Sequence, residues 1–190
     1  MKKYKIGVFG SAINENNKTI KKAKELGKEL GKYKNKVIVV TGACSGMPYM
    51  VASQSAQAGL EIWGYSPEVN LKHQREFTPS DDISIYKKLI YVPGNFELMN
   101  QPLACKKYRN VISTFNCDAG IIIAGRWGSL NEFTNLMAFG KVVGVLAGTG
   151  GIADELKMLT KKIKKKRCGK VIINSSPKKL MERIIYELSK

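Results

Sequence analysis

Cysteine and histidine are scarce in this sequence. Its 190 residues include a single histidine, His73, and four cysteines with no CxxC pair among them. Neither a zinc site nor a disulfide framework is indicated by so few and so scattered ligands. We therefore expect no bound metal and no resident cofactor, and we expect the cysteines to be small core residues or surface thiols of a cytoplasmic protein. The cysteines are Cys44, Cys105, Cys117 and Cys168.

Long apolar runs are also absent, because no apolar stretch approaches the length needed to cross a bilayer. This excludes a membrane-spanning protein. Hydrophobic residues make up 44% of the chain and charged residues 25%, which is typical of a globular domain. A chain of this length can bury a sufficient core without disulfides or metals. We expect one domain over residues 1–190.

Acidic residues are few relative to basic ones, and the formal net charge is +17. Such an excess raises the question of a nucleic-acid partner. The lysines, however, are mostly spread along predicted helices, and the one dense basic run, at 161–167, has no aromatic residues interleaved for base stacking. A solvated basic surface is therefore favoured over a nucleic-acid interface.

Short β-branched segments alternate with longer amphipathic segments along the chain, a pattern typical of repeated βα units. We predict a Rossmann-like three-layer αβα fold with a mostly parallel sheet of about seven strands. The expected strands are 5–9, 36–41, 60–65, 88–92, 119–124, 142–146 and 170–174, and the expected helices are 17–33, 46–58, 97–116, 129–139, 150–165 and 177–189. Residues 66–86 lack clear periodicity, which is typical of a functional loop, a lid or an oligomer contact.

Glycine follows most of these predicted strands. Ligands of parallel sheets bind beyond the carboxyl ends of the strands, so Gly10, Ser11 and Gly42 are candidate ligand-binding residues. The sequence has no GxxxxGK[ST] motif and no GxGxxG after the first strand, which argues against a P-loop nucleoside triphosphatase and an ordinary dinucleotide oxidoreductase.

The loop after the fifth predicted strand, 124–129, is the strongest candidate for a phosphate site. Gly125 and Gly128 let the backbone approach an anion closely, and the free amides at the start of the following helix can bind it. Ser129 can cap the helix and donate a hydroxyl group. The alternative is that residues 129–132 form a capping box and nothing more, and spacing alone leaves both interpretations open. The candidate ligand-binding residues here are Gly125, Arg126, Trp127, Gly128, Ser129 and Leu130.

Two segments resemble the signature of the LONELY GUY (LOG) superfamily. Arg109-Asn110 on a predicted helix, the strand 119–124 and the loop leading to Glu132 follow that family's order of Arg-Lys or Arg-Asn, strand, and Pro-Gly-Gly-x-Gly-Thr-x-x-Glu. Downstream, 140–145 and 148–154 look closest to a branch that includes molybdenum cofactor carrier proteins and Rossmann-type nucleotide-binding proteins. The likeness covers most of the chain except 66–86.

This resemblance implies roles for individual residues. The loop 125–129 would hold a nucleotide phosphate, and Arg109 and Glu132 would be a catalytic pair that hydrolyses the N-glycosidic bond of a nucleoside 5′-monophosphate. The chemistry suits these side chains, because a carboxylate can stabilise an oxocarbenium-like centre or activate water and an arginine can hold ribose or phosphate oxygens. The structural alternative is a salt-bridged arginine and a glutamate favoured by the helix dipole. The resemblance also implies a homodimer or larger assembly, and the helix 97–116, which carries Arg109, is our candidate interface.

The decisive motif departs from the family pattern at three positions. Ala124 replaces the proline, Arg126 the second glycine and Ser129 the threonine. Arg126 can obstruct the pocket or add a charge-assisted contact to an anion, and Trp127 can stack on a base or pack in a core or dimer.

Three hypotheses follow from these residues. The first is a nucleoside monophosphate phosphoribohydrolase. The second is a non-catalytic carrier or sensor of a nucleotide-like cofactor such as the molybdenum cofactor. The third, a DNA-binding relative in the manner of DNA-processing protein A, rests on net charge and distant fold similarity alone.

Overall fold

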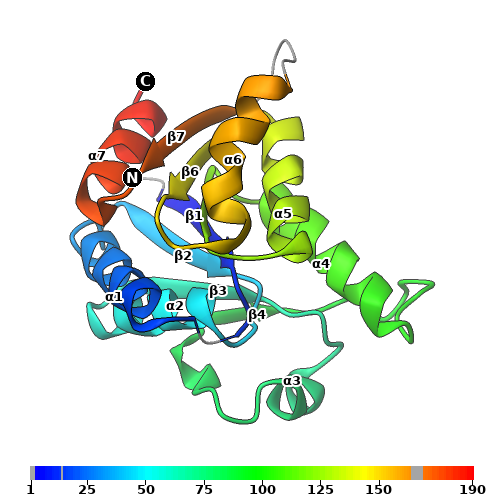
Figure 1. The fold of residues 1–190 in the computed structure, drawn as a ribbon. Helices are drawn as coiled ribbons and strands as arrows, with labels where there is room; N and C mark the ends of the chain where they lie inside the picture. The colour runs from blue at the N-terminus through cyan, green and yellow to red at the C-terminus, as the bar shows by residue number, and fades with distance from the viewer. Residues whose placement is uncertain (1–2, 14, 164–168) are drawn as a thin grey trace.

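The computed structural model describes residues 3–13, 15–163 and 169–190. Its centre is one seven-stranded parallel sheet in the order β4-β3-β2-β1-β5-β6-β7, drawn as arrows in Figure 1. The strands are β1 (Tyr4–Gly10), β2 (Val37–Thr41), β3 (Glu61–Tyr65), β4 (Lys88–Ile90), β5 (Ala119–Ile123), β6 (Val142–Leu146) and β7 (Lys170–Asn174). All seven predicted strands are present.

Helices cover both faces of the sheet (Figure 1). On one face lie α1 (Asn17–Gly31), α2 (Met47–Gln57) and α7 (Pro177–Leu188), and on the other lie α4 (Pro102–Phe115), α5 (Trp127–Ala138) and α6 (Gly151–Lys162). A short helix, α3 (Leu71–Phe77), and a single 3₁₀ turn, η1 (Ile83–Ile85), stand between β3 and β4. The predicted three-layer αβα architecture is confirmed.

Alternating side chains of the central strands build two cores. Ile6 and Val8 of β1 are fully buried in the cluster beneath α1, α2 and α7, whereas Phe9 points to the cluster beneath α5 and α6. Ile121 and Ile122 of β5 divide between the two clusters in the same way. Because successive side chains of a strand face opposite sides, a strand covered on both faces must be apolar throughout.

Several helix boundaries differ from those predicted. α4 begins at Pro102 instead of residue 97, because a proline is favoured in the first helical turn, where no backbone donor is needed. α5 begins at Trp127, two residues earlier than expected. Residues 66–86, for which no structure was predicted, contain α3 and η1.

The segment 66–86 packs on the carboxyl end of β2. The Gln74 side-chain amide donates to the carbonyl of Ala43 at 3.0 Å, and the Ser45 hydroxyl donates to the Asp81 carboxylate at 2.8 Å. Gln74 itself is fully buried. These contacts hold the segment beside the loop that follows β2, so it contributes to the packing at the edge of the sheet where ligands of this fold class bind.

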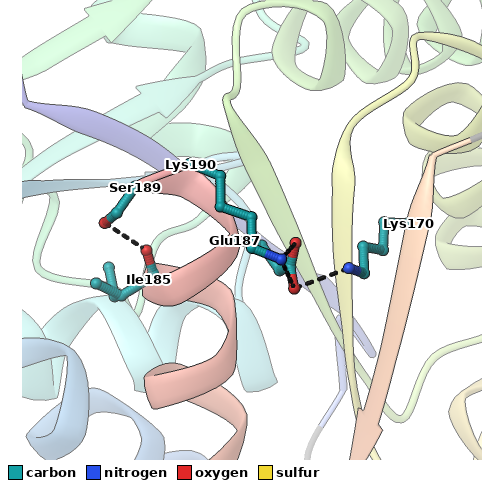
Figure 2. A network of polar contacts seen from close by, with 5 residues as sticks. All are labelled: Lys170, Ile185, Glu187, Ser189 and Lys190. Carbon is teal, nitrogen blue, oxygen red and sulfur yellow. Dashed lines mark hydrogen bonds and ion pairs between the residues drawn. The ribbon is translucent and has the colours of Figure 1, made fainter.

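An ion pair joins the carboxyl-terminal helix α7 to the edge strand β7. Figure 2 shows Glu187 of α7 between Lys170 and Lys190, with Nζ to Oε1 distances of 2.8 Å and 3.2 Å. In the same picture the Ser189 hydroxyl donates to the carbonyl of Ile185 at 2.7 Å. Hydrogen bonding from Lys170 lowers the pKa of the Glu187 carboxyl group.

Within the described ranges, every helix is too short or too polar to span a bilayer. α6 ends at Lys162 instead of residue 165. Residues 164–167 of the basic run and Cys168 lie outside the described residues.

Candidate functional site

The neighbours of β1 locate the candidate site. β1 pairs with β2 on one side and with β5 on the other, so the chain changes direction across the sheet between β1 and β5. Parallel sheets bind ligands in the crevice at such a switch point, beyond the carboxyl ends of the strands. A cavity of about 550 Å³ lies at this place, lined by the loops after β1, β2 and β5 and by α4 and α5.

Most of the predicted site residues line this cavity. They are Gly10, Ser11, Arg109, Arg126, Gly128, Ser129 and Glu132. The others do not. Gly42 instead accepts a hydrogen bond from Arg109, and Gly125 contacts the Ser129 side chain. Trp127 is 82% exposed, and Leu130 packs partly buried against the core.

The amino end of α5 has no side-chain cap. Arg126 is the N-cap residue, and its carbonyl accepts the Leu130 amide at 2.9 Å. The amides of Trp127, Gly128 and Ser129 precede that bond and have no partner within the helix. Gly128 and Ser129 line the cavity, and a Cβ built on Gly128 would meet nothing within 4 Å, so the space beside Gly128 is open. Unpaired amides facing an open cavity form a site for an anion.

The predicted capping role of Ser129 is wrong. Ser129 is the third residue of α5, and no hydrogen bond from its hydroxyl is found among the described residues. The capping-box alternative fails for the same reason, because Glu132 lies in the second turn of the helix instead of the first. Both side chains line the cavity, and both are buried, at 2% and 6% exposure.

The loop after β5 is held in a demanding backbone conformation. Ala124 has φ +50° and Gly125 has φ +94°, of which only the second suits its residue type. The Thr149 hydroxyl accepts the Ala124 amide at 2.9 Å and donates to the carbonyl of Leu146 at 2.7 Å. Arg126 has φ −132°, so its position does not require glycine.

Two buried donors in the cavity wall have no partner among the residues that the structure describes. Arg109 is 9% exposed and donates through Nη1 to the carbonyl of Gly42, but its Nε atom is buried without an acceptor. The Ser11 hydroxyl, on a residue 2% exposed, is also unpaired. Unpaired buried donors cost free energy and are uncommon in folded proteins. Two of them at one cavity favour a polar occupant.

Glu132 is the acidic residue in the cavity wall. Burial raises the pKa of its carboxyl group from 4.5 to about 7, although the positive charges of Arg109 and Lys107 act in the opposite direction. Within the described residues, Glu132 and Arg109 form no ion pair, so neither charge is neutralised by direct contact with the other. A carboxyl group with such a pKa can take up or release a proton near pH 7.

Sequence reasoning missed several residues of the cavity. Lys106, Lys107 and Asn110 of α4 line it together with Arg109. Their helical spacing was a usable signal, because residues three and four apart share a helix face. Cys44, in the loop after β2, also lines the cavity, and burial raises the pKa of its thiol. In the part of the chain that the structure describes, no three metal-ligating side chains gather at one place.

The glycine loop after β6 differs from the loop after β5. The Asp154 carboxylate accepts the amides of Gly148 and Gly150 at 2.6 Å and 2.9 Å. These donors at the start of α6 are therefore already paired. Of the two glycine loops, only the one before α5 leaves its amides open to a ligand.

Comparisons with known proteins give the family and the fold of the chain. The sequence profile of the SLOG cluster4 family matches residues 3–181. The chain belongs to this family. The predicted membership of the LOG-like Rossmann superfamily is thereby confirmed. No curated protein is similar enough to the chain to count as a match.

Solved structures share the fold at low sequence identity. The structure of TM1055 has a TM-score of 0.75 at 19% identity, with 97% of this chain and 99% of that chain covered. The molybdenum cofactor carrier protein of Chlamydomonas reinhardtii has a TM-score of 0.68 at 17% identity, with both chains fully covered. DNA processing protein A of Streptococcus pneumoniae has a TM-score of 0.65 at 18% identity, with 95% of this chain and 61% of that chain covered.

Proposed function

We propose that this chain binds the phosphate of a nucleotide-type small molecule in the cavity between β1 and β5. The observation that carries the proposal is the uncapped amino end of α5, where Gly128 and Ser129 line the cavity. The unpaired Ser11 hydroxyl and Arg109 Nε support it, because a phosphate oxygen would supply the missing acceptor.

The same cavity suits hydrolysis of an N-glycosidic bond. In that reaction the bond between the ribose C1′ and the base nitrogen breaks, water supplies the oxygen that bonds to C1′, and the base leaves with a proton. We propose that Glu132, which lines the cavity, exchanges this proton; its pKa of about 7 lets both protonation states exist near neutral pH. Arg109 would hold ribose or phosphate oxygens through its remaining donors. We propose these two residues as the catalytic pair.

Incubation with a panel of nucleotides tests the hydrolase. Free base released from any of them is measured for the wild-type chain and for Glu132→Gln and Arg109→Lys. We expect each variant to lose roughly 100-fold or more in rate, the usual scale for a general acid or base. Lys28→Gln, an exposed change on α1, is the control and keeps full activity. Absence of release from every nucleotide contradicts the hydrolase and leaves phosphate binding to be judged separately.

A non-catalytic carrier or sensor is the second candidate. It is favoured by the similarity to the molybdenum cofactor carrier fold and by Arg126, a cation at the cavity where the LOG pattern has glycine. A carrier needs the α5 amides and the cations but no proton exchange. Glu132→Gln would then leave the affinity for a nucleotide-like ligand within roughly threefold of the wild type, whereas a hydrolase would lose turnover.

DNA binding is the third candidate, supported by the fold shared with DNA processing protein A and by the net charge of +17. Its signature is an affinity for single-stranded DNA that falls steeply with salt. Absence of binding at low salt would exclude it.

We also propose that two copies of the chain associate through α4. Val111 and Phe115 are 42% and 59% exposed, and their spacing of four residues places them on one face of the helix. A second copy would cover this face. Sedimentation should show a dimer that Val111→Glu dissociates, whereas Leu71→Glu, at a similarly exposed position on α3, leaves it intact. A monomeric wild-type chain contradicts the pairing.

A further inference from the structure

The cavity carries more positive charge than one phosphate group neutralises. Of the residues that the structure describes, four with cationic side chains line it, namely Lys106, Lys107, Arg109 and Arg126, and one with a carboxyl group, Glu132. A phosphate monoester carries at most two negative charges near neutral pH. The open amides at the start of α5 add a partial positive charge to the same space.

The cavity also offers donors at more than one place. The amides of Gly128 and Ser129 and the Ser129 hydroxyl lie at the start of α5, where the oxygens of one phosphate group can share them. The Ser11 hydroxyl and Arg109 Nε remain unpaired, and both residues line the same cavity. Further oxygens on the ligand would find partners there.

Arg126 is free to serve such a group. Arg126 is exposed and lines the cavity, and its negative φ is one that an arginine adopts without strain. It immediately precedes the open amides of α5. Lys106 and Lys107 of α4 also line the cavity, and both residues are likewise exposed. A guanidinium group binds phosphate oxygens in pairs, whereas a lysine contributes a point charge.

We propose that the cavity takes a ligand with two or more linked phosphate groups, with the α5 amides binding one phosphate and Arg126, Lys106 and Lys107 binding the next. This inference rests on the proposed function, because it assigns the chemical class of the ligand at the same site. A volume of about 550 Å³ leaves room for a diphosphate and an attached ribose or base.

Calorimetric titration with simple probes tests the proposal. Inorganic phosphate, pyrophosphate and tripolyphosphate are compared at one ionic strength, followed by AMP and ADP. For the wild-type chain we expect pyrophosphate to bind roughly 10-fold or more tightly than phosphate, and ADP to exceed AMP by a similar ratio. Arg126→Gln should reduce this preference to within roughly threefold, and Lys106→Gln should reduce it in part.

Lys28→Gln is the matched control, because it removes one exposed positive charge from α1, outside the cavity lining. It should leave the preference unchanged. Equal affinity for phosphate and pyrophosphate overturns the inference while the proposed function stands. A preference that Arg126→Gln and Lys28→Gln lower equally overturns it too, since net charge alone would then be responsible. Absence of binding by every probe overturns the proposed function together with the inference.

Discussion

The guanidinium group of Arg109 donates through Nη1 to the backbone carbonyl of Gly42, joining α4 to the loop after β2 across 67 residues of sequence. Gly42 makes room for this contact, because a Cβ built there would overlap the Arg109 Nη1 atom. The two residues were both predicted as site residues. The contact gives them different positions, with Arg109 in the cavity wall and Gly42 behind it.

Gly42→Ala should therefore displace Arg109 and weaken ligand binding. The added methyl group forces the guanidinium group to move, at a cost of about 1–3 kcal/mol in unfolding free energy. Pyrophosphate affinity should fall roughly 10-fold in a calorimetric titration. Gly94→Ala is the control, because a Cβ at Gly94 meets nothing within 4 Å. An unchanged affinity in Gly42→Ala would mean that the position of Arg109 does not matter for binding.

Glu132 makes folding depend on pH in a defined direction. Its pKa rises from 4.5 to about 7 in the folded chain, so the folded state holds a proton that the unfolded state has released between these values. Stability contributed by the protonated carboxyl group is thus complete below about pH 4.5 and is lost as pH rises to about 7.

Glu132→Gln removes this dependence. We expect the variant to exceed the wild type in unfolding free energy by about 3 kcal/mol at pH 8, with most of that difference gone by pH 4.5. Urea denaturation at the two pH values measures it. A difference that is equal at both, or larger in acid, would show that Glu132 is not a buried acid with a raised pKa.

Ala124 is predicted to tolerate glycine and to reject proline, the residue found at this position in the LOG pattern. Its φ of +50° lies far from the value near −65° that a proline ring requires, and its amide donates to the Thr149 hydroxyl. Ala124→Pro should lower the unfolding free energy by about 3 kcal/mol or more, whereas Ala124→Gly should stay within about 1 kcal/mol of the wild type. Thermal unfolding of both variants measures this difference in stability. Equal stability of the two would contradict a positive φ here.

Thr149 is expected to fix the loop before α5. Thr149→Val removes the hydroxyl group that pairs with the Ala124 amide and the Leu146 carbonyl, leaving a buried donor without a partner. The expected loss is about 1–3 kcal/mol of unfolding free energy. Thr134→Val, which removes an exposed hydroxyl bonded within α5, should cost about 0.5 kcal/mol or less. Similar losses in the two variants would remove the special role of Thr149.

The sheet was predictable from sequence because several of its strands, such as β5 and β6, are apolar throughout. The runs at 119–123 and 142–146 are buried on both faces, and such segments between amphipathic stretches have few other structures open to them. The first residues of the helices were harder to predict. Ser129 has the residue type of an N-cap, but α5 begins two residues earlier at Trp127, with Arg126 in a cap position that its side chain does not fill.

The candidate site was predictable in part. Arg109 and Glu132 could be named from motif order, and the cavity brings both to one wall. Lys106 and Lys107 were counted only as part of the net charge, because a basic helix has the same composition whether its lysines face solvent or a cavity. From sequence, the loop after β6 could not be distinguished from the other glycine-containing loops that follow strands. Its amides are paired with Asp154, which lies six and four residues further along the chain, a local contact of the folded loop that composition does not reveal.

The most direct test of the central claim follows the backbone amides by two-dimensional nitrogen–proton NMR while pyrophosphate is added. If an anion binds at the start of α5, the amide signals of Gly128 and Ser129 should show the largest shifts and saturate together. Gly148 and Gly150, whose amides are held by Asp154, are internal controls and should move little. Shifts scattered over the lysine-rich helices, with none concentrated at Gly128 and Ser129, would contradict a phosphate site in this cavity.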